Sequence, residues 1–122
     1  CCTPITPDNG KSLRVSGTYK YSYEEEECYP EKGIDRVKPF VEWIKQNKFH
    51  GFIGEYGIPD NDPRWNETLD LFLGYLQENG INGTYWAAGP WWDSYFMAIT
   101  PKDGKDRPQM PIIEKYTSTL KK

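Results

Sequence analysis

The clearest hydrophobic pattern lies between residues 34 and 47. Apolar side chains recur there every three or four positions, with charged residues between them, which predicts an amphipathic helix. Pro39 falls either in its first turn or at a kink. A second helix is predicted from Asp62-Pro63, an N-cap followed by proline at the first helical position, to a terminating Gly80. The apolar faces comprise Ile34, Val37, Val41 and Ile44 in the first helix and Trp65, Leu69, Phe72 and Leu76 in the second.

Two short apolar segments follow these helices. Residues 49–57 are bounded by glycine and predict a fully buried strand that ends at Glu55, and residues 83–88 predict a second strand before Gly89-Pro90. Residues 110–120 predict a last helix after a long loop. Strands that alternate with helices at this spacing indicate βαβ units around a parallel sheet.

The first part of the chain is less regular. Residues 1–17 have no hydrophobic period, so we expect an irregular lead-in before a single domain that spans residues 18–122. Tyr19, Tyr21 and Tyr23 alternate with polar residues, a pattern compatible with a short strand and equally with an aromatic loop.

Composition and charge narrow the ligand classes. Aromatic residues make up 16% of the chain, with five Trp, nine Tyr and five Phe, and surplus aromatic rings serve as flat platforms for ligands. The net charge of −3 and the acidic run 24–27, which we expect in a solvated turn or helix start, argue against a nucleic-acid partner. No apolar stretch approaches the roughly 20 residues of a membrane span. Neutral carbohydrate fits this composition better than a polyanion does.

Other features favour export. Three cysteines are an odd count, which allows Cys28 to pair with Cys1 or Cys2 in an oxidising compartment and leaves the pairing open, and two glycosylation sequons begin at Asn66 and Asn82. The chain begins without an initiator Met or signal peptide, which predicts a processed, trimmed or excised piece. One His and three scattered Cys make no metal-ligand set, so we expect no metal and no cofactor.

The candidate chemistry lies where the predicted strands end, because functional groups of parallel α/β folds gather at the carboxyl ends of strands. Glu55 closes an apolar strand, where an unpaired buried charge is costly. It is either an exposed or salt-bridged strand terminus, or a catalytic carboxylate that faces a cleft. Trp86, Trp91 and Trp92 favour the second alternative, since a carboxylate beside an indole platform suits glycosidic cleavage. The helical Trp43 and Trp65 are expected to be packing residues.

The segments 51–57 and 85–92 resemble the seventh and eighth strands of glycoside hydrolase family 5, the cellulase family with a (β/α)8 barrel. The resemblance implies that Glu55 is the catalytic nucleophile, that Trp86 stacks the sugar, and that Trp91 and Trp92 line adjoining subsites. It implies an α/β fold, namely the part of a TIM barrel from roughly strand six or seven to helix eight. Residues 16–19 also resemble the segment that follows the family's sixth strand.

The departures from the family pattern concern the other half of the active site. The Asn-Glu-Pro segment that carries the acid/base is missing, and Asn66-Glu67 belongs to a helix start. Residues 11–15 replace the family's His-x-Tyr, and His50 falls at the end of its strand opposite the active site, where we expect a structural role. A whole barrel takes about 250 residues, twice this length.

The sequence leads to three hypotheses about function. In the first, the chain supplies the nucleophile half of a secreted, retaining enzyme that cleaves β-1,4-glucan-type polysaccharide, and a complementary barrel fragment or a second copy completes it. In the second, the chain is a non-catalytic carbohydrate-binding module. In the third, a carboxylate of the acidic run 24–27 acts as the acid in a small self-sufficient hydrolase.

Overall fold

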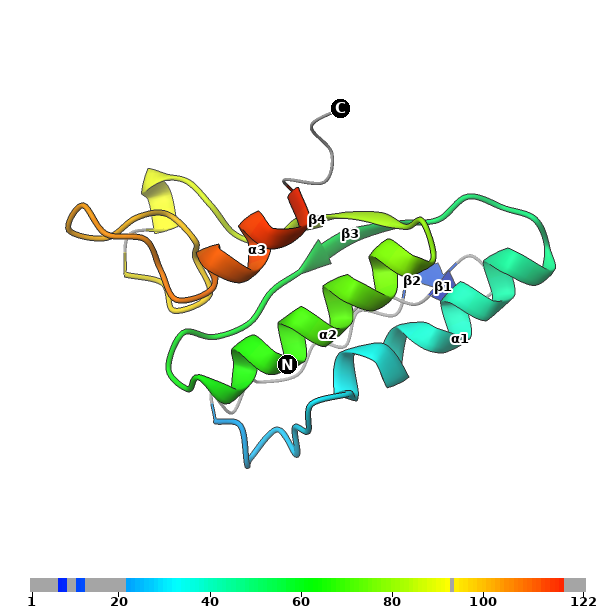
Figure 1. Cartoon of the computed structure of the whole chain (residues 1–122), viewed down its shortest axis with the longest axis horizontal. Helices are drawn as coiled ribbons and strands as arrows, with labels where there is room; N and C mark the ends of the chain where they lie inside the picture. Colours follow the sequence, from blue (N-terminus) through cyan, green and yellow to red (C-terminus); the bar gives the residue numbers. More distant parts are fainter. Residues whose placement is uncertain (1–6, 9–10, 13–21, 93, 118–122) are drawn as a thin grey trace.

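A computed structural model describes residues 7–8, 11–12, 22–92 and 94–117 (Figure 1). Its elements follow the predicted order of helix, strand, helix, strand and helix, preceded by two very short strands where no regular element was expected. They are β1 (Pro7–Asp8), β2 (Lys11–Ser12), α1 (Lys32–Gln46), β3 (Phe52–Tyr56), α2 (Arg64–Glu78), β4 (Asn82–Tyr85), the 3₁₀ turn η1 (Pro90–Trp92) and α3 (Met110–Thr117). Tyr19, Tyr21 and residues 118–120 of the predicted last helix lie outside the described residues.

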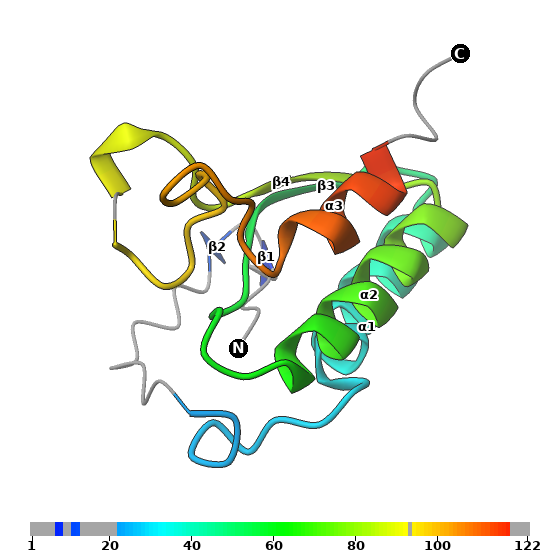
Figure 2. The same ribbon diagram turned by 60° about the vertical axis from the view of Figure 1, so that its left-hand side comes forward.

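The strands β3 and β4 pair in parallel, as the alternation of elements predicted. Figures 1 and 2 show α1 and α2 side by side on one side of this pair, with α3 next to α2. The buried core joins Ile53 and Tyr56 of β3 to apolar side chains of all three helices. One face of the sheet is therefore covered by the helix layer.

The other face of β3 is open, and the prediction of a fully buried strand was wrong. Phe52 is 57% exposed, and Gly54 and Glu55 are exposed as well, whereas Ile53 and Tyr56 are buried. A strand is buried on both faces only where both carry a layer of packing elements. Among the described residues, helices pack on one face alone.

The helix α1 follows its predicted hydrophobic stripe. Val37, Val41 and Ile44 are buried, and Pro39 lies inside the helix on the exposed side. Trp43 was expected to be a packing residue, but it is 50% exposed, and its ring lies 5.4 Å from that of Phe49 between centroids. Trp43 is off the stripe, so nothing in the helix layer covers it.

The helix α2 ends before the predicted Gly80, but it begins at Arg64 with Pro63 as its N-cap, one residue later than predicted. A carboxylate oxygen of Asp62 accepts a hydrogen bond from the backbone N–H of Arg64 at 2.9 Å, and Gly80 adopts a left-handed φ of 66° just past the helix. Trp65 is fully buried, which confirms its packing role, and Tyr23 meets it edge-on at 5.0 Å between centroids.

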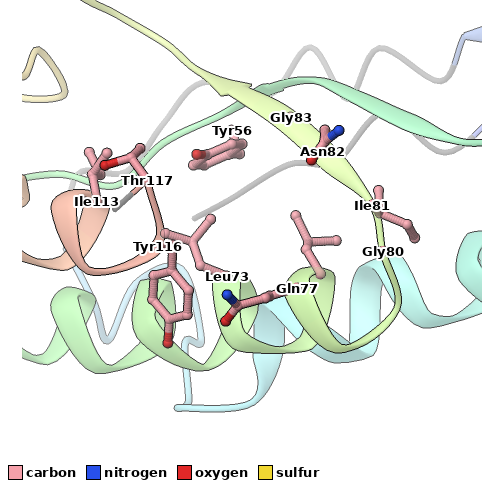
Figure 3. A pocket seen from close by; sticks show the side chains of 11 residues that line it. Tyr56, Leu73, Gln77, Gly80, Ile81, Asn82, Gly83, Ile113, Tyr116 and Thr117 are labelled. Atoms are coloured by element: carbon pink, nitrogen blue, oxygen red, sulfur yellow. The ribbon is translucent and has the colours of Figure 1, made fainter. Parts of the chain in front are cut away.

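A cavity of about 280 Å³ lies between α2, α3 and the amino end of β4 (Figure 3). It is mainly apolar, with Tyr56, Leu73, Ile81 and Ile113 among its lining residues. Tyr116 also lines it and ties α3 to α2, because its hydroxyl donates to the backbone oxygen of Asp70 at 2.8 Å or to its carboxylate.

The tie between α3 and α2 predicts a pH dependence of stability. The Tyr116 hydroxyl, together with Lys115 at 3.0 Å, holds the pKa of Asp70 below its ordinary value of 3.8. A carboxyl whose pKa is lower in the folded state adds stability that is complete above its unfolded pKa and is lost as pH falls through the folded value. Asp70→Asn should lower the urea midpoint at neutral pH, and its deficit against the wild type should shrink below pH 3.8. A deficit that stays constant would contradict this role.

The close approach of β3 and β4 predicts a second effect. A β-carbon at Gly57 would lie within 3.0 Å of the carbonyl oxygen of Trp86, whereas one at Gly54 would meet nothing within 4 Å. Gly57→Ala should lower the free energy of unfolding by about 1–3 kcal/mol through overpacking. Gly54→Ala, the matched control three residues earlier within β3, should change it by less than about 0.5 kcal/mol. Urea denaturation followed by tryptophan fluorescence measures the free energy of unfolding of both variants. Equal effects would contradict the close contact between the backbones at Gly57 and Trp86.

Candidate functional site

A bulge in β3 determines on which face of the sheet Glu55 lies. The register pairs Ile53 with Gly83 and Tyr56 with Tyr85, so β3 has one residue more than β4 between these two pairs. Side chains of a regular strand alternate between faces, which would put residue 55 on the same covered face as Ile53. The extra residue shifts this alternation, and Glu55 becomes exposed while Tyr56 takes the buried position. The carboxylate therefore belongs to the open face.

Trp86 follows directly after β4 and lies next to this bulge. Its backbone N–H donates to the carbonyl oxygen of Tyr56 at 2.8 Å, and the hydroxyl of Thr84 donates to the carbonyl oxygen of Gly54. These bonds place the backbone of Trp86 next to the bulge at the carboxyl end of the strand pair, and Trp86, which was predicted to lie within the second strand, follows its last residue. The indole of Trp86 is 36% exposed.

Three rings form an aromatic cluster, which we define as Trp86, Trp92 and Tyr95. Trp92 meets Trp86 edge-on at 4.7 Å between centroids, and Tyr95 meets it at 5.5 Å. Trp92 and Tyr95 lie 5.2 Å apart, so each ring contacts the other two. Trp91, from the same η1 turn, is 88% exposed.

Tyr95 is a cluster member that sequence reasoning missed as a site residue. The available signal was its place in a loop rich in Trp, Tyr and Phe directly after the second predicted strand. Its backbone N–H donates to the carbonyl oxygen of Trp92 at 2.6 Å, and this turn brings it back beside Trp86.

The Glu55 carboxylate makes no hydrogen bond or ion pair with any part of the chain that the structure describes. The acidic run 24–27 forms the predicted turn before α1, and Glu24 pairs there with Arg64. This hydrogen bond from Arg64 lowers the pKa of Glu24. A general acid needs the opposite shift, because it must remain protonated near neutral pH.

Other predicted residues lie away from this edge. His50 is exposed and precedes β3, at the end of the strand opposite Glu55. The thiol of Cys28 contacts Thr68 at 3.9 Å, and its candidate disulfide partners Cys1 and Cys2 fall outside the described residues. Of the sequon residues, Asn66 lies in α2 and Asn82 is exposed at the start of β4.

Neither a metal-binding cluster nor a membrane-spanning helix occurs among the described residues. They contain no group of three or more His, Cys, Asp or Glu side chains placed to hold a metal ion. Within the same part of the chain, no helix combines the length and apolar character needed to cross a membrane.

The chain matches a family model over residues 13–91, and the model describes cellulases of glycosyl hydrolase family 5. A probable endo-beta-1,4-glucanase B of Aspergillus kawachii is 38% identical over 96 residues, which cover 75% of this chain and 29% of that protein. The endo-beta-1,4-glucanase B of Aspergillus niger is 36% identical, covering 69% of this chain and 26% of its own length. The chain thus spans less than a third of these relatives.

Solved structures that resemble this chain are also endoglucanases, and the chain again covers less than a third of each. The endoglucanase Cel5A of Pseudomonas stutzeri, solved with cellobiose, has a TM-score of 0.74 and 43% identity, covering 80% of this chain and 30% of that one. XacCel5A, solved with cellopentaose, has a TM-score of 0.67 and 37% identity over 71% of this chain and 29% of that one. The predicted fold class is confirmed: the α/β unit is a partial (β/α)8 barrel. The chain belongs to glycosyl hydrolase family 5, the cellulase family.

Proposed function

We propose that this chain supplies the nucleophile half of a retaining endoglucanase that cleaves β-1,4-glucan-type polysaccharide. The observation that carries the proposal is the bulge in β3, which exposes the Glu55 carboxylate beside Trp86 at the carboxyl end of two parallel strands. The active sites of TIM-barrel enzymes lie at this end. The names of the relatives and their glucan-derived ligands support the substrate class.

In the proposed reaction, Glu55 attacks the anomeric carbon and forms a covalent glycosyl-enzyme, which water then hydrolyses with net retention. Trp86 stacks against the sugar at the cleavage point, and Trp91 and Trp92 line adjoining subsites. The high exposure of Trp91 suits an outer platform, whereas the contact of Trp92 with Trp86 suits a role beside the central sugar.

The reaction needs a second carboxyl group, the acid/base, about 5–5.5 Å from the nucleophile. Glu24 is disfavoured because its bond to Arg64 lowers its pKa. We therefore propose that a complementary barrel fragment brings the acid/base to Glu55, and that either this fragment or a second copy of the chain covers the open strand edges. On this account residues 18–122 form the barrel portion, residues 1–17 are its lead-in, and the complete enzyme is secreted.

A second candidate function is a carbohydrate-binding module without catalysis. The exposed Trp91 and the aromatic cluster suit glycan binding whether or not a second carboxyl group ever reaches Glu55. The two functions differ in one respect only, namely the release of reducing sugar.

Hydrolysis of soluble β-glucan is the test of the nucleophile. We expect reducing-sugar release by the chain together with a complementary family 5 fragment that carries an acid/base, and we expect Glu55→Gln to lower the rate by about 10⁴-fold. Glu24→Gln is the matched control and should keep the wild-type rate. If the chain binds glucan and Glu55→Gln binds equally, but neither releases sugar in any mixture, the module is the correct function.

The mass in solution tests the need for a partner. Exposed strand edges and the exposed Phe52 on the open face promote pairing with another chain, so we expect the isolated protein to self-associate at a high concentration. Phe52→Thr should weaken this association because Phe52 is 57% exposed on the open face. Leu71→Thr, at an exposed position of α2, should not. Light scattering measures the mass, and a stable folded wild-type monomer at every concentration would contradict the partner proposal.

A further inference from the structure

A single hydroxyl group connects the two loops that follow β3 and β4. Tyr85 is the last residue of β4, and its ring packs edge-on against Tyr56 at 5.6 Å between centroids. Its hydroxyl oxygen lies 3.3 Å from the backbone nitrogen of Ile58, 3.0 Å from the carbonyl oxygen of Ile58 and 2.8 Å from that of Met97. A hydroxyl has one proton and two lone pairs, so it accepts from Ile58 and donates to one of the two carbonyls at a time.

Two further side chains hold the same pair of loops. The fully buried Gln109 donates to the carbonyl oxygens of Ile58 and Phe96 at 3.2 and 3.3 Å. Arg107, also buried, donates to the Asp60 carboxylate at 2.8 Å. The backbone N–H of Asp60 bonds to the carbonyl oxygen of Phe96 at 3.0 Å. The loops therefore remain connected by these bonds if the Tyr85 hydroxyl is removed.

The residues that these bonds connect lie next to residues of the candidate site in the sequence. Ile58 lies three residues after Glu55, and Tyr85 directly precedes Trp86. Phe96 follows Tyr95, whose ring contacts both Trp86 and Phe96. A displacement of the Tyr85 ring would move Trp86 relative to the strand that carries Glu55.

We propose that Tyr85 is a positioning residue whose hydroxyl sets the place of the Trp86 indole relative to Glu55 and Tyr95. Catalysis and glycan binding depend on such placement, and small displacements lower both. The inference deepens the proposed function and, for its effect on glycan, rests on it. Its geometric part, the arrangement of the aromatic cluster, stands independently of any activity.

The test compares Tyr85→Phe with Tyr116→Phe in the full chain. Both changes remove one hydroxyl from a partly buried tyrosine, but the Tyr116 hydroxyl bonds to Asp70 between α2 and α3. Three quantities are measured for each: the urea midpoint, the Kd for cellopentaose from tryptophan fluorescence, and the exciton band in circular dichroism. Trp86 and Trp92, 4.7 Å apart at an interplanar angle of 66°, are expected to produce that band.

We expect similar, modest losses of urea midpoint in both variants. Tyr85→Phe alone should weaken cellopentaose binding, by about fivefold to tenfold, and alter the exciton band. Tyr116→Phe should keep both within error of the wild type. An unchanged exciton band in Tyr85→Phe, or equal changes in the two variants, would overturn the proposal. If the wild type fails to bind cellopentaose, the proposed function is at fault, and the exciton band still decides whether Tyr85 positions Trp86.

Discussion

The parallel pairing of β3 with β4 is the constraint on which both halves of the candidate site depend. It brings the two backbones so close at Gly57 that a β-carbon there would lie within 3.0 Å of the carbonyl oxygen of Trp86. Within the same pairing, one extra residue in β3 reverses the alternation of side chains and exposes Glu55. Backbone geometry thus brings the residues that carry the carboxylate and the indole to the same end of the strand pair.

One-sided burial explains why this arrangement is open. The helix layer covers one face of the strand pair, and its core joins Ile53 and Tyr56 to α1, α2 and α3. In a complete (β/α)8 barrel the opposite face points to the interior, where side chains of other strands fill the space. This chain presents that face to solvent, with Phe52 and Glu55 exposed. The same openness makes Glu55 accessible, and we propose that a partner supplies the second carboxyl group that retaining hydrolysis requires.

Features that depend on local sequence were predictable. The stripe of α1, the hydrogen bond of Asp62 to Arg64 at the start of α2 and the left-handed Gly80 each rest on residues within a few positions of one another. The bulge was not predictable, because it depends on the register against a partner strand about 30 residues away. The bonds of Tyr85 and Gln109 to Ile58 likewise join distant segments and leave no periodic signal. The fully buried strand was mispredicted because a short apolar run does not show whether one or both faces are covered.

We propose that Glu55 forms the covalent intermediate. The most direct measurement uses an activated fluorosugar derivative of cellobiose, which forms the glycosyl-enzyme of a retaining glycosidase but hydrolyses very slowly. The chain, completed by a partner that restores hydrolysis, is incubated with this reagent and mapped by peptide mass spectrometry. The account predicts a single added cellobiosyl group on the peptide that contains Glu55, and none in Glu55→Gln. A label on another carboxylate of this chain or of its partner, with Glu55 unmodified, would contradict it.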